Sequence, residues 1–177
     1  MEENQKIPMR SQVKKEDTWA IEDMYATVED WEKDFAAAKK VAEEAAEYAG
    51  RLGESAQALY DWSALTEKLD CMLSEIYGYA SRVKDQDTAD AAGQTLSARA
   101  MGLYVECSGL ISFADPEILS IPEEKLEAFY AEKPELLKYR RSINEVRRCK
   151  DHILSPELEK ILADAGEMAP VSYTHLR

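Results

Sequence analysis

The chain has 177 residues, of which 45% are hydrophobic and 32% are charged, and it contains only 7 glycines and 6 prolines. This composition favours a soluble, mostly helical globular protein over a disordered chain. The 35 acidic residues outnumber the 22 basic ones, and the formal net charge of −13 disfavours nucleic acid and anionic membranes as partners, because like charges repel.

The predicted elements begin after a polar stretch, residues 1–15, which we expect to be flexible and extended. Pro8 opposes a helix in this stretch, and no apolar run of the signal-peptide type is present. A short turn-like anchor follows, and its apolar residues are Trp19, Ile21, Met24 and Tyr25.

The first long helix is expected over residues 28–50, within a region, residues 16–113, that should form an N-terminal helical hairpin or bundle. Thr27 is the predicted N-cap of this helix, with Asp30 three residues later as in a capping box, and Gly50 is its predicted end. Its inner face should consist of Trp31, Phe35, Ala38, Val41, Ala45 and Tyr48.

The second helix begins at Ser55 and carries the strongest periodic signal in the sequence, because its apolar residues alternate in spacing between three and four positions. These residues are Trp62, Leu65, Leu69, Met72, Ile76, Tyr79 and Val83. The third helix, with Thr88 as its predicted cap, should bury Ala92, Leu96, Ala100, Leu103, Cys107 and Leu110. Only a short turn joins these two helices, so they must run antiparallel as a helical hairpin.

Residues 114–168 are expected to form a second helical region that runs on from the third long helix. Pro116, Pro122 and Pro134 each stand where a short helix can begin, and each is followed by a glutamate, which suits a helix N-terminus. A longer helix should then bury Leu136, Tyr139, Ile143, Val146 and Ile153. A last helix, capped by Ser155, carries Leu158, Ile161, Leu162 and Ala165. No segment alternates as a strand would, so the expected fold class is all-α.

Residues with obvious catalytic chemistry are scarce. The sequence has no Gly-rich phosphate loop and no Gly-x-Ser-x-Gly elbow. Its two histidines are His152 and His175, whereas a helical zinc site needs two histidines four residues apart with a glutamate between them. We interpret His152 as interacting with the carbonyl end of its helix, and Cys149 beside it lacks the orienting group and oxyanion site that a cysteine nucleophile needs. We therefore predict no catalytic, cofactor-binding or metal-binding residue in this chain.

The three cysteines, Cys71, Cys107 and Cys149, are too few and too far apart for a disulfide framework. Each lies in a helical pattern, so we interpret them as reduced core thiols of a cytoplasmic protein. No apolar run in the sequence is long enough to span a bilayer.

Two further residue groups could suggest binding, and each has a simpler explanation. Five aromatic residues stand at core spacing and are interpreted as packing residues rather than a ligand box: Trp19, Trp31, Trp62, Tyr77 and Tyr79. The basic run over residues 138–150 is interpreted as a solvated helix face. The alternative for this run is a surface that meets an acidic partner or domain.

Four stretches in order together resemble one family, oligoendopeptidase F, whose members are cytoplasmic zinc metallopeptidases related to thimet oligopeptidase. The stretches are "DTWAIEDMYATVEDWEKDF", "EIYGYASRVKDQDTADAAGQTLSARA", "SFADPEILSIPEEKLEAFY" and "RRCKDHILSPELEKILADAGEM". They cover about residues 10–168 and are similar to the N-terminal helical region of the family. None of them is a catalytic motif.

The resemblance implies a parent enzyme that hydrolyses short oligopeptides in a channel between helical lobes. Zinc would be held by the two histidines of an HExxH helix and a more distant glutamate, and the metal would activate the attacking water. The N-terminal helices would be one lobe and a non-catalytic wall of that channel, with the catalytic domain in cis beyond residue 177. The chain alone should then be inactive. The alternatives are an autonomous acidic α-helical interaction module and a purely structural helical protein.

The last residues do not fit this pattern. After residue 168 the helical pattern ends, and "PVSYTHLR" resembles the translation of a transposon-type sequencing adapter. We therefore expect residues 169–177 to be a non-native tail, and we assign His175 no function.

A lobe that lacks its packing partner should expose apolar surface. We therefore expect the isolated chain to be soluble but prone to self-association, and to bind a dye that reports exposed apolar surface. Analytical ultracentrifugation and dye fluorescence test this. A strictly monomeric, cooperatively unfolding protein that binds no dye would contradict the expectation.

Overall fold

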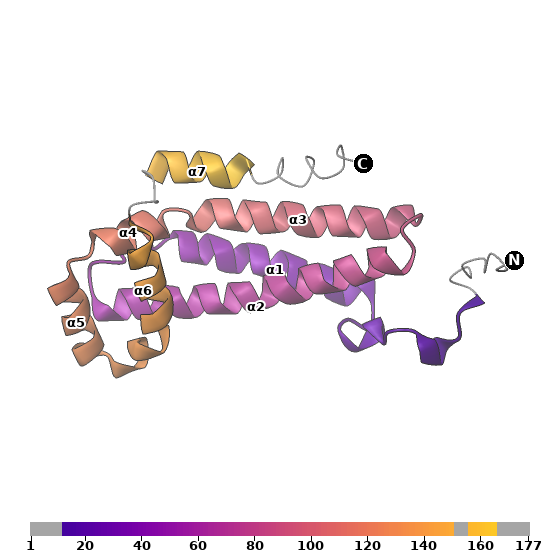
Figure 1. Cartoon of the computed structure of the whole chain (residues 1–177), viewed down its shortest axis with the longest axis horizontal. Coiled ribbons are helices and arrows are strands. Elements are labelled where there is room, and N and C mark those ends of the chain that lie inside the picture. Colours follow the sequence, from indigo (N-terminus) through magenta and orange to yellow (C-terminus); the bar gives the residue numbers. More distant parts are fainter. Residues whose placement is uncertain (1–11, 151–155, 166–177) are drawn as a thin grey trace, which may run out of the picture.

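The computed structural model describes residues 12–150 and 156–165 of the chain. In chain order its elements are η2 (Lys15–Asp17), η3 (Ile21–Asp23), α1 (Val28–Ala46), α2 (Ala56–Gln86), α3 (Ala91–Ile111), α4 (Ala114–Ser120), α5 (Glu123–Glu132), η4 (Pro134–Tyr139), α6 (Arg140–Arg148) and α7 (Pro156–Asp164). Every regular element of the described residues is a helix, which confirms the all-α prediction (Figure 1). None of these helices is long and apolar enough to cross a membrane.

Helices α1, α2 and α3 form an antiparallel three-helix bundle in which each helix packs against the other two (Figure 1). A short turn over residues 87–90 joins α2 to α3, so the predicted helical hairpin is confirmed. The longest helix is α2 with 31 residues. At 1.5 Å per residue it spans about 46 Å, far enough to extend beyond the bundle.

The core of the bundle is centred on Trp31, which is completely buried. Its indole N–H donates a hydrogen bond of 3.0 Å to the carbonyl oxygen of Ile76 on α2, so the ring fills the core without leaving its polar atom unpaired. The apolar seams of α2 and α3 surround it. Their buried members are Leu69, Leu73, Ile76, Tyr79, Ala80, Leu96, Ala100, Leu103 and Cys107, which confirms most of the predicted seam positions.

One seam position was predicted wrongly. Ala92 is exposed, and the buried residue beside it is Gly93. A Cβ atom on Gly93 would lie 3.1 Å from the Cα of Lys84, so the absence of a side chain lets the first turn of α3 approach the backbone of α2 closely.

Charged side chains connect α1 to α3 across the surface of the bundle. Arg99 binds Glu32 through two hydrogen bonds of 2.5 and 2.8 Å, which is the forked geometry favoured by a guanidinium and a carboxylate. The same guanidinium lies 5.1 Å from the ring centre of Trp31 and 5.0 Å from that of Phe35. Arg99 therefore covers the edge of the aromatic core while its charge stays paired.

Two of the predicted caps are confirmed, and the predicted cap Ser155 lies outside the described residues. The Thr27 hydroxyl accepts a hydrogen bond of 3.2 Å from the N–H of Asp30, and the Ser55 hydroxyl accepts one of 3.1 Å from the N–H of Ala58. The prediction of Thr88 as the cap of α3 was wrong. Asp90 caps this helix instead, because its carboxylate lies next to the first turn and accepts from two N–H groups.

The second helical region contains α4, α5, η4 and α6, which surround a separate hydrophobic core. The buried residues of this core are Leu52, Ala56, Leu59, Ala114, Ile118, Ile121, Leu126, Phe129, Tyr130, Leu136 and Ile143. Three of them precede or begin α2, so the first turns of α2 belong to this core. The longer helix predicted after Pro134 is divided into η4 and α6, and the predicted inward residue Ile153 lies outside the described residues.

A carboxylate joins the bundle to the second region. Glu117 on α4 accepts hydrogen bonds from the backbone N–H groups of Gly50 and Leu52, the second at 3.2 Å. Gly50 has φ +80°, a left-handed conformation that suits glycine. Contrary to the prediction, α1 ends four residues before Gly50, at Ala46, and Gly50 lies in the connection that Glu117 holds.

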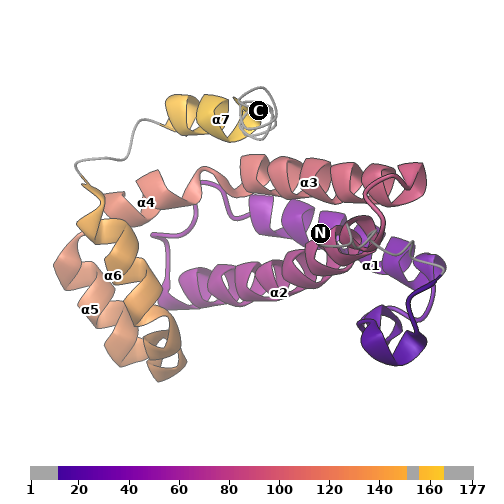
Figure 2. The ribbon, with the colours of Figure 1, turned by 45° about the vertical axis from the view of Figure 1, so that its right-hand side comes forward.

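Helix α7 lies along α3, outside the bundle (Figure 2). Gly109 of α3 permits this approach, since a Cβ atom there would lie 3.1 Å from a carboxylate oxygen of Asp164. Three of the apolar residues of α7 are exposed: Leu158 by 48%, Ile161 by 61% and Leu162 by 57%. The described part of the chain supplies no element that covers these side chains.

Several other residues expected in the core lie at the surface. Trp19 is 70% exposed beside Arg82, and Tyr77 is 40% exposed on the outer side of α2. Among the cysteines only Cys107 is buried, whereas Cys71 and Cys149 are exposed. A helical pattern places a residue on a helix but does not determine which side of the helix receives a neighbour.

The predicted boundary at residues 113/114 and the predicted tail at residues 169–177 stay predictions, and the tail lies outside the described residues.

Substitution Glu117→Ala should lower the free energy of unfolding by about 2 kcal/mol, because it removes a charged acceptor from two backbone N–H groups. Urea denaturation followed by circular dichroism measures this. The control is Glu124→Ala, an exposed glutamate in α5, which should change the value by less than about 0.5 kcal/mol. Equal effects of the two substitutions would contradict a linking role for Glu117.

Candidate functional site

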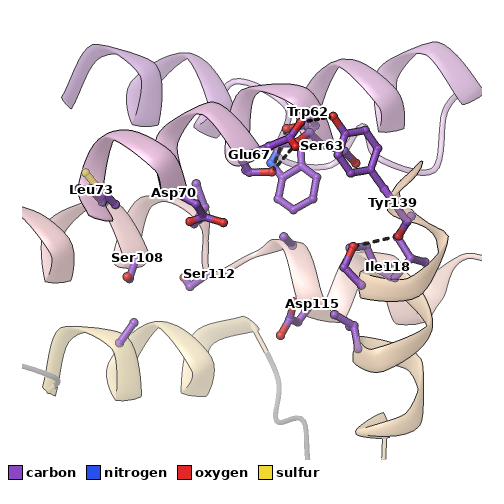
Figure 3. A pocket seen from close by; sticks show the side chains of 18 of the residues that line it. Trp62, Ser63, Glu67, Asp70, Leu73, Ser108, Ser112, Asp115, Ile118 and Tyr139 are labelled. Carbon is purple, nitrogen blue, oxygen red and sulfur yellow. Dashed lines mark hydrogen bonds between the residues drawn. The ribbon is translucent and has the colours of Figure 1, made fainter. Parts of the chain in front are cut away.

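A pocket of about 820 Å³ lies where the bundle meets the second helical region (Figure 3). Its walls come from α2, α3, α4, η4, α6 and α7. Apolar lining residues include Trp62, Leu73, Tyr104, Ile111, Ile118 and Val146, and polar ones include Ser63, Thr66, Glu67, Asp70, Ser112 and Asp115. A pocket of this size, mostly apolar with a few polar groups, is typical of sites that hold small ligands.

One carboxylate of the pocket is already neutralised within the chain. Glu67 on α2 accepts hydrogen bonds from Lys138 at 2.5 Å and from the hydroxyl of Tyr139 at 2.8 Å. These hydrogen bonds, with that from Lys138 the larger effect, lower the pKa of Glu67 below its ordinary value. Glu67 is therefore ionised and paired near neutral pH.

Asp70 lies about one turn after Glu67 on α2, and its surroundings differ from those of Glu67. Its carboxylate points from α2 into the space next to the end of α3, where Ser112 lies (Figure 3). Partial burial raises the pKa of Asp70 above its ordinary value, because apolar surroundings disfavour the charged form. No hydrogen bond or ion pair from the described residues opposes this shift.

Trp62 has a buried polar atom beside the pocket. Its ring packs edge-on against Phe113 with ring centres 6.4 Å apart. Its indole N–H is buried and has no hydrogen-bond acceptor among the described residues. Buried donors are almost always paired, and leaving one unpaired costs about 1–3 kcal/mol.

The cysteines of the pocket wall do not form a nucleophilic site. Burial raises the pKa of Cys107 to about 11, so its thiol is protonated at neutral pH, and Cys71 is exposed on α2. Cys149 follows α6 as its C-terminal cap and is exposed, and His152, the residue weighed as its partner, lies outside the described residues. His175 lies outside them as well.

The described residues also do not fit the zinc that the family resemblance implies. Within residues 12–150 and 156–165, no group of three or more His, Cys, Asp or Glu side chains could hold a metal ion. The predictions of no catalytic, cofactor-binding or metal-binding residue stay predictions.

Several cations of the basic run, residues 138–150, form ion pairs or hydrogen bonds within the same chain. Lys138 binds Glu67 of α2, and Arg140 binds Glu127 of α5 at 2.7 Å. Arg147 donates a hydrogen bond of 2.8 Å to the carbonyl oxygen of Ile121. These pairs lie at the surface, which agrees with a solvated helix face, and the alternative of a surface that meets an acidic partner or domain stays a prediction.

The pocket itself was missed in the sequence. Trp62 was interpreted only as packing, and Asp70 was one of many carboxylates. A usable signal existed, because Trp62, Thr66 and Asp70 recur every four residues and so share one side of α2. This stripe was missed because it lies beside the apolar residues by which α2 was recognised as a helix.

Replacing Asp70 should stabilise the protein at neutral pH. The pKa of Asp70 is higher in the folded than in the unfolded chain. Its favourable contribution to the free energy of unfolding is therefore complete below the ordinary pKa of an aspartate, about 4, where the carboxyl is protonated in both states. That contribution is lost as the pH rises through the folded-state pKa and the carboxyl ionises. We expect Asp70→Asn to raise the melting temperature at pH 7 and to have a smaller effect as the pH falls toward 4. Asp85→Asn, at an exposed position of α2, is the control. Destabilisation by Asp70→Asn that is larger at pH 7 than at pH 4 would show that the Asp70 charge is paired.

Comparison with known proteins identifies relatives that extend well beyond this chain. A family profile described as Oligopeptidase F matches residues 117–176, a range that includes most of the predicted tail. Oligopeptidase PepF of Bacillus subtilis (strain 168) is 39% identical over 162 residues, which are 92% of this chain and 24% of that protein. Group B oligopeptidase PepB of Streptococcus agalactiae is 33% identical over 159 residues, or 90% of this chain and 26% of the relative.

The fold has a solved counterpart. The crystal structure of oligoendopeptidase-F from Enterococcus faecium superposes with a TM-score of 0.74 at 27% identity, covering 80% of this chain and 28% of that one. The chain thus spans about a quarter of the length of the relatives that it matches. On these grounds, the chain belongs to the oligoendopeptidase F family.

Proposed function

We propose that this chain is the N-terminal, non-catalytic part of a zinc metalloendopeptidase that hydrolyses short oligopeptides. The observation that carries the proposal is the extent of the match. The relative named oligopeptidase PepF is 39% identical over 92% of this chain, and the aligned segment is only 24% of that relative. The activity would then depend on the larger part of the polypeptide, which this chain does not include.

The location of the catalytic residues follows from the same proposal. The described residues offer no cluster of metal ligands, so the zinc site of the parent enzyme would lie outside them. The part of the chain described here would shape the space through which substrates reach that site. Its construction suits such a wall, because the Arg99–Glu32 pair and the buried Trp31 hold α1, α2 and α3 together as one unit. An entrance bounded by rigid helices admits extended peptides and excludes folded proteins.

We infer a cytoplasmic location from the family resemblance and from the cysteines. Cys71, Cys107 and Cys149 are all free thiols in the structure. Free thiols persist where the surroundings are reducing.

A second candidate function has one observation in its favour. The exposed apolar residues Leu158, Ile161 and Leu162 form a row on α7 with the spacing of a helix that docks against another. An autonomous acidic interaction module would use such a row to bind a partner helix. The match to longer peptidases favours the first function, because it accounts for the whole described chain rather than for α7 alone.

The test compares two proteins made from the source DNA. The first is the 177-residue chain, and the second is the longest natural reading frame that contains residues 1–168. With a quenched-fluorescent oligopeptide, we expect cleavage only by the longer protein, and we expect a zinc chelator to abolish that cleavage. The longer frame should encode an HExxH motif.

Two results would overturn the proposal. One is a longer reading frame that has no HExxH motif and produces no cleavage. The other is stoichiometric zinc and chelator-sensitive cleavage with the 177-residue chain itself, because the activity would then reside in the residues present here.

A further inference from the structure

Helix α7 carries an apolar row that no described residue covers. The row consists of Leu158, Ile161 and Leu162, and each of these side chains is about half exposed or more. Their spacing of three and four residues places them on one side of the helix. The contact of α7 with α3 lies beside Asp164, which is next to Gly109. Helix α7 therefore touches the bundle and still leaves an apolar side uncovered within the described chain.

A fourth exposed apolar side chain, on α3, belongs to the same surface. Tyr104 is 51% exposed, and both Tyr104 and Leu162 line the hollow of about 820 Å³ between α2 and α7 (Figure 3). We call the hollow and the row beside it the α7 groove, and its exposed apolar residues are Tyr104, Leu158, Ile161 and Leu162. In soluble proteins, adjoining exposed apolar side chains of this kind mark a surface that another protein element covers.

The charges around the α7 groove disfavour a second copy of this chain as its occupant. Glu67, Asp70 and Asp115 line the hollow, and the one basic residue among its described lining residues, Lys138, is paired with Glu67. A second copy would bring a further net charge of −13 to this acidic surface, and like charges repel. An occupant that combines apolar side chains with an excess of lysine or arginine is favoured instead.

The lengths of the relatives indicate where such an occupant comes from. The matched segment is 24% of oligopeptidase PepF of Bacillus subtilis and 28% of the oligoendopeptidase-F chain of Enterococcus faecium. Under the proposed function the remaining polypeptide follows this chain, and α7 is its last described helix. A later segment of the same polypeptide is therefore held near the α7 groove at a high effective concentration.

We propose that the α7 groove is the docking site for a basic amphipathic helix of the same polypeptide, located beyond this chain in the parent enzyme. This inference rests on the proposed function, because it takes from that function that the remaining polypeptide follows this chain. The occupant is a helix because side chains three and four residues apart, as in the row of α7, form ridges that fit between those of another helix. Docking would bury the row and join this region to the rest of the enzyme.

The first measurement is hydrogen exchange, read by mass spectrometry, in two proteins. One is the 177-residue chain, and the other is the longest natural reading frame that contains residues 1–168. We expect the amides of α7 to exchange about tenfold more slowly, or slower still, in the longer protein, because burial of a leucine side chain favours the docked state by roughly that factor.

The second measurement repeats this comparison with Leu162→Asp. In the longer protein the substitution should speed the exchange of α7 about tenfold, because it places a charge in the docked surface. In the 177-residue chain the rate should change by less than about threefold, since Leu162 is already exposed there. The matched control is Val28→Asp, which is 46% exposed where α1 begins, at the end of the bundle away from α4 (Figure 1). It should leave the exchange of α7 in the longer protein within about threefold of the original.

The third measurement identifies the occupant. Lys160 is exposed on α7 beside the row, so a lysine-specific crosslinker can attach to it in the longer protein. We expect crosslinks from Lys160 to a segment beyond this chain, and the sequence of that segment should be amphipathic at helical spacing and contain more basic than acidic residues.

Equal exchange of α7 in the two proteins overturns the inference, as does a folded Leu162→Asp variant of the longer protein whose α7 stays as protected as the original. Crosslinks that join Lys160 only to a second copy overturn it as well, because the occupant would then be another chain. A longer protein that cleaves peptides but leaves α7 unprotected rejects only the docking site. Protection of α7 without cleavage rejects only the peptidase assignment, and a natural reading frame that ends with this chain rejects both.

Discussion

Both hydrophobic cores of this protein are built on one continuous helix. The first turns of α2 bury Leu59 against α4 and α5, and the later turns bury Leu69 and Ile76 against α1 and α3. α2 runs for 31 residues without a proline. Because the helix is continuous, it joins the two cores. The pocket occupies the interval along α2 where one core ends and the other begins.

The negative charge of the chain is distributed unevenly over this framework. Several cations of the described residues pair with glutamates on other helices, as Arg99 does with Glu32 and Lys138 does with Glu67. Such exposed pairs contribute little to stability individually, but they use the few positive charges at contacts between helices. Asp70 forms no ion pair with the described residues, and its side chain is exposed on α2. Within the described residues, the buried N–H of Trp62 and the buried hydroxyl of Tyr130 are left without a hydrogen-bond partner.

The exposed row on α7 has a related physical origin. Leu158, Ile161 and Leu162 would be buried in a protein whose next element covered them, and the described chain has no such element on that side. Relatives about four times as long as the aligned segment contain much more polypeptide. The chain thus keeps a completed core in its bundle and an uncovered apolar side on its last described helix, and these two conditions are expected of one part of a larger fold.

The sequence by itself determined the helices, most of their caps and the buried seam of α2, because apolar spacing and capping residues act within a few turns of chain. It also placed the chain in its family through four ordered stretches. Only the tertiary structure decided which side of each helix is covered, and so it separated the exposed Trp19 from the buried Trp31. It likewise brought Glu117 to the N–H of Gly50, a contact between residues 67 positions apart. The physical reason is that burial and pairing depend on neighbours from distant parts of the chain, whereas periodicity records only that a helix has a side to bury.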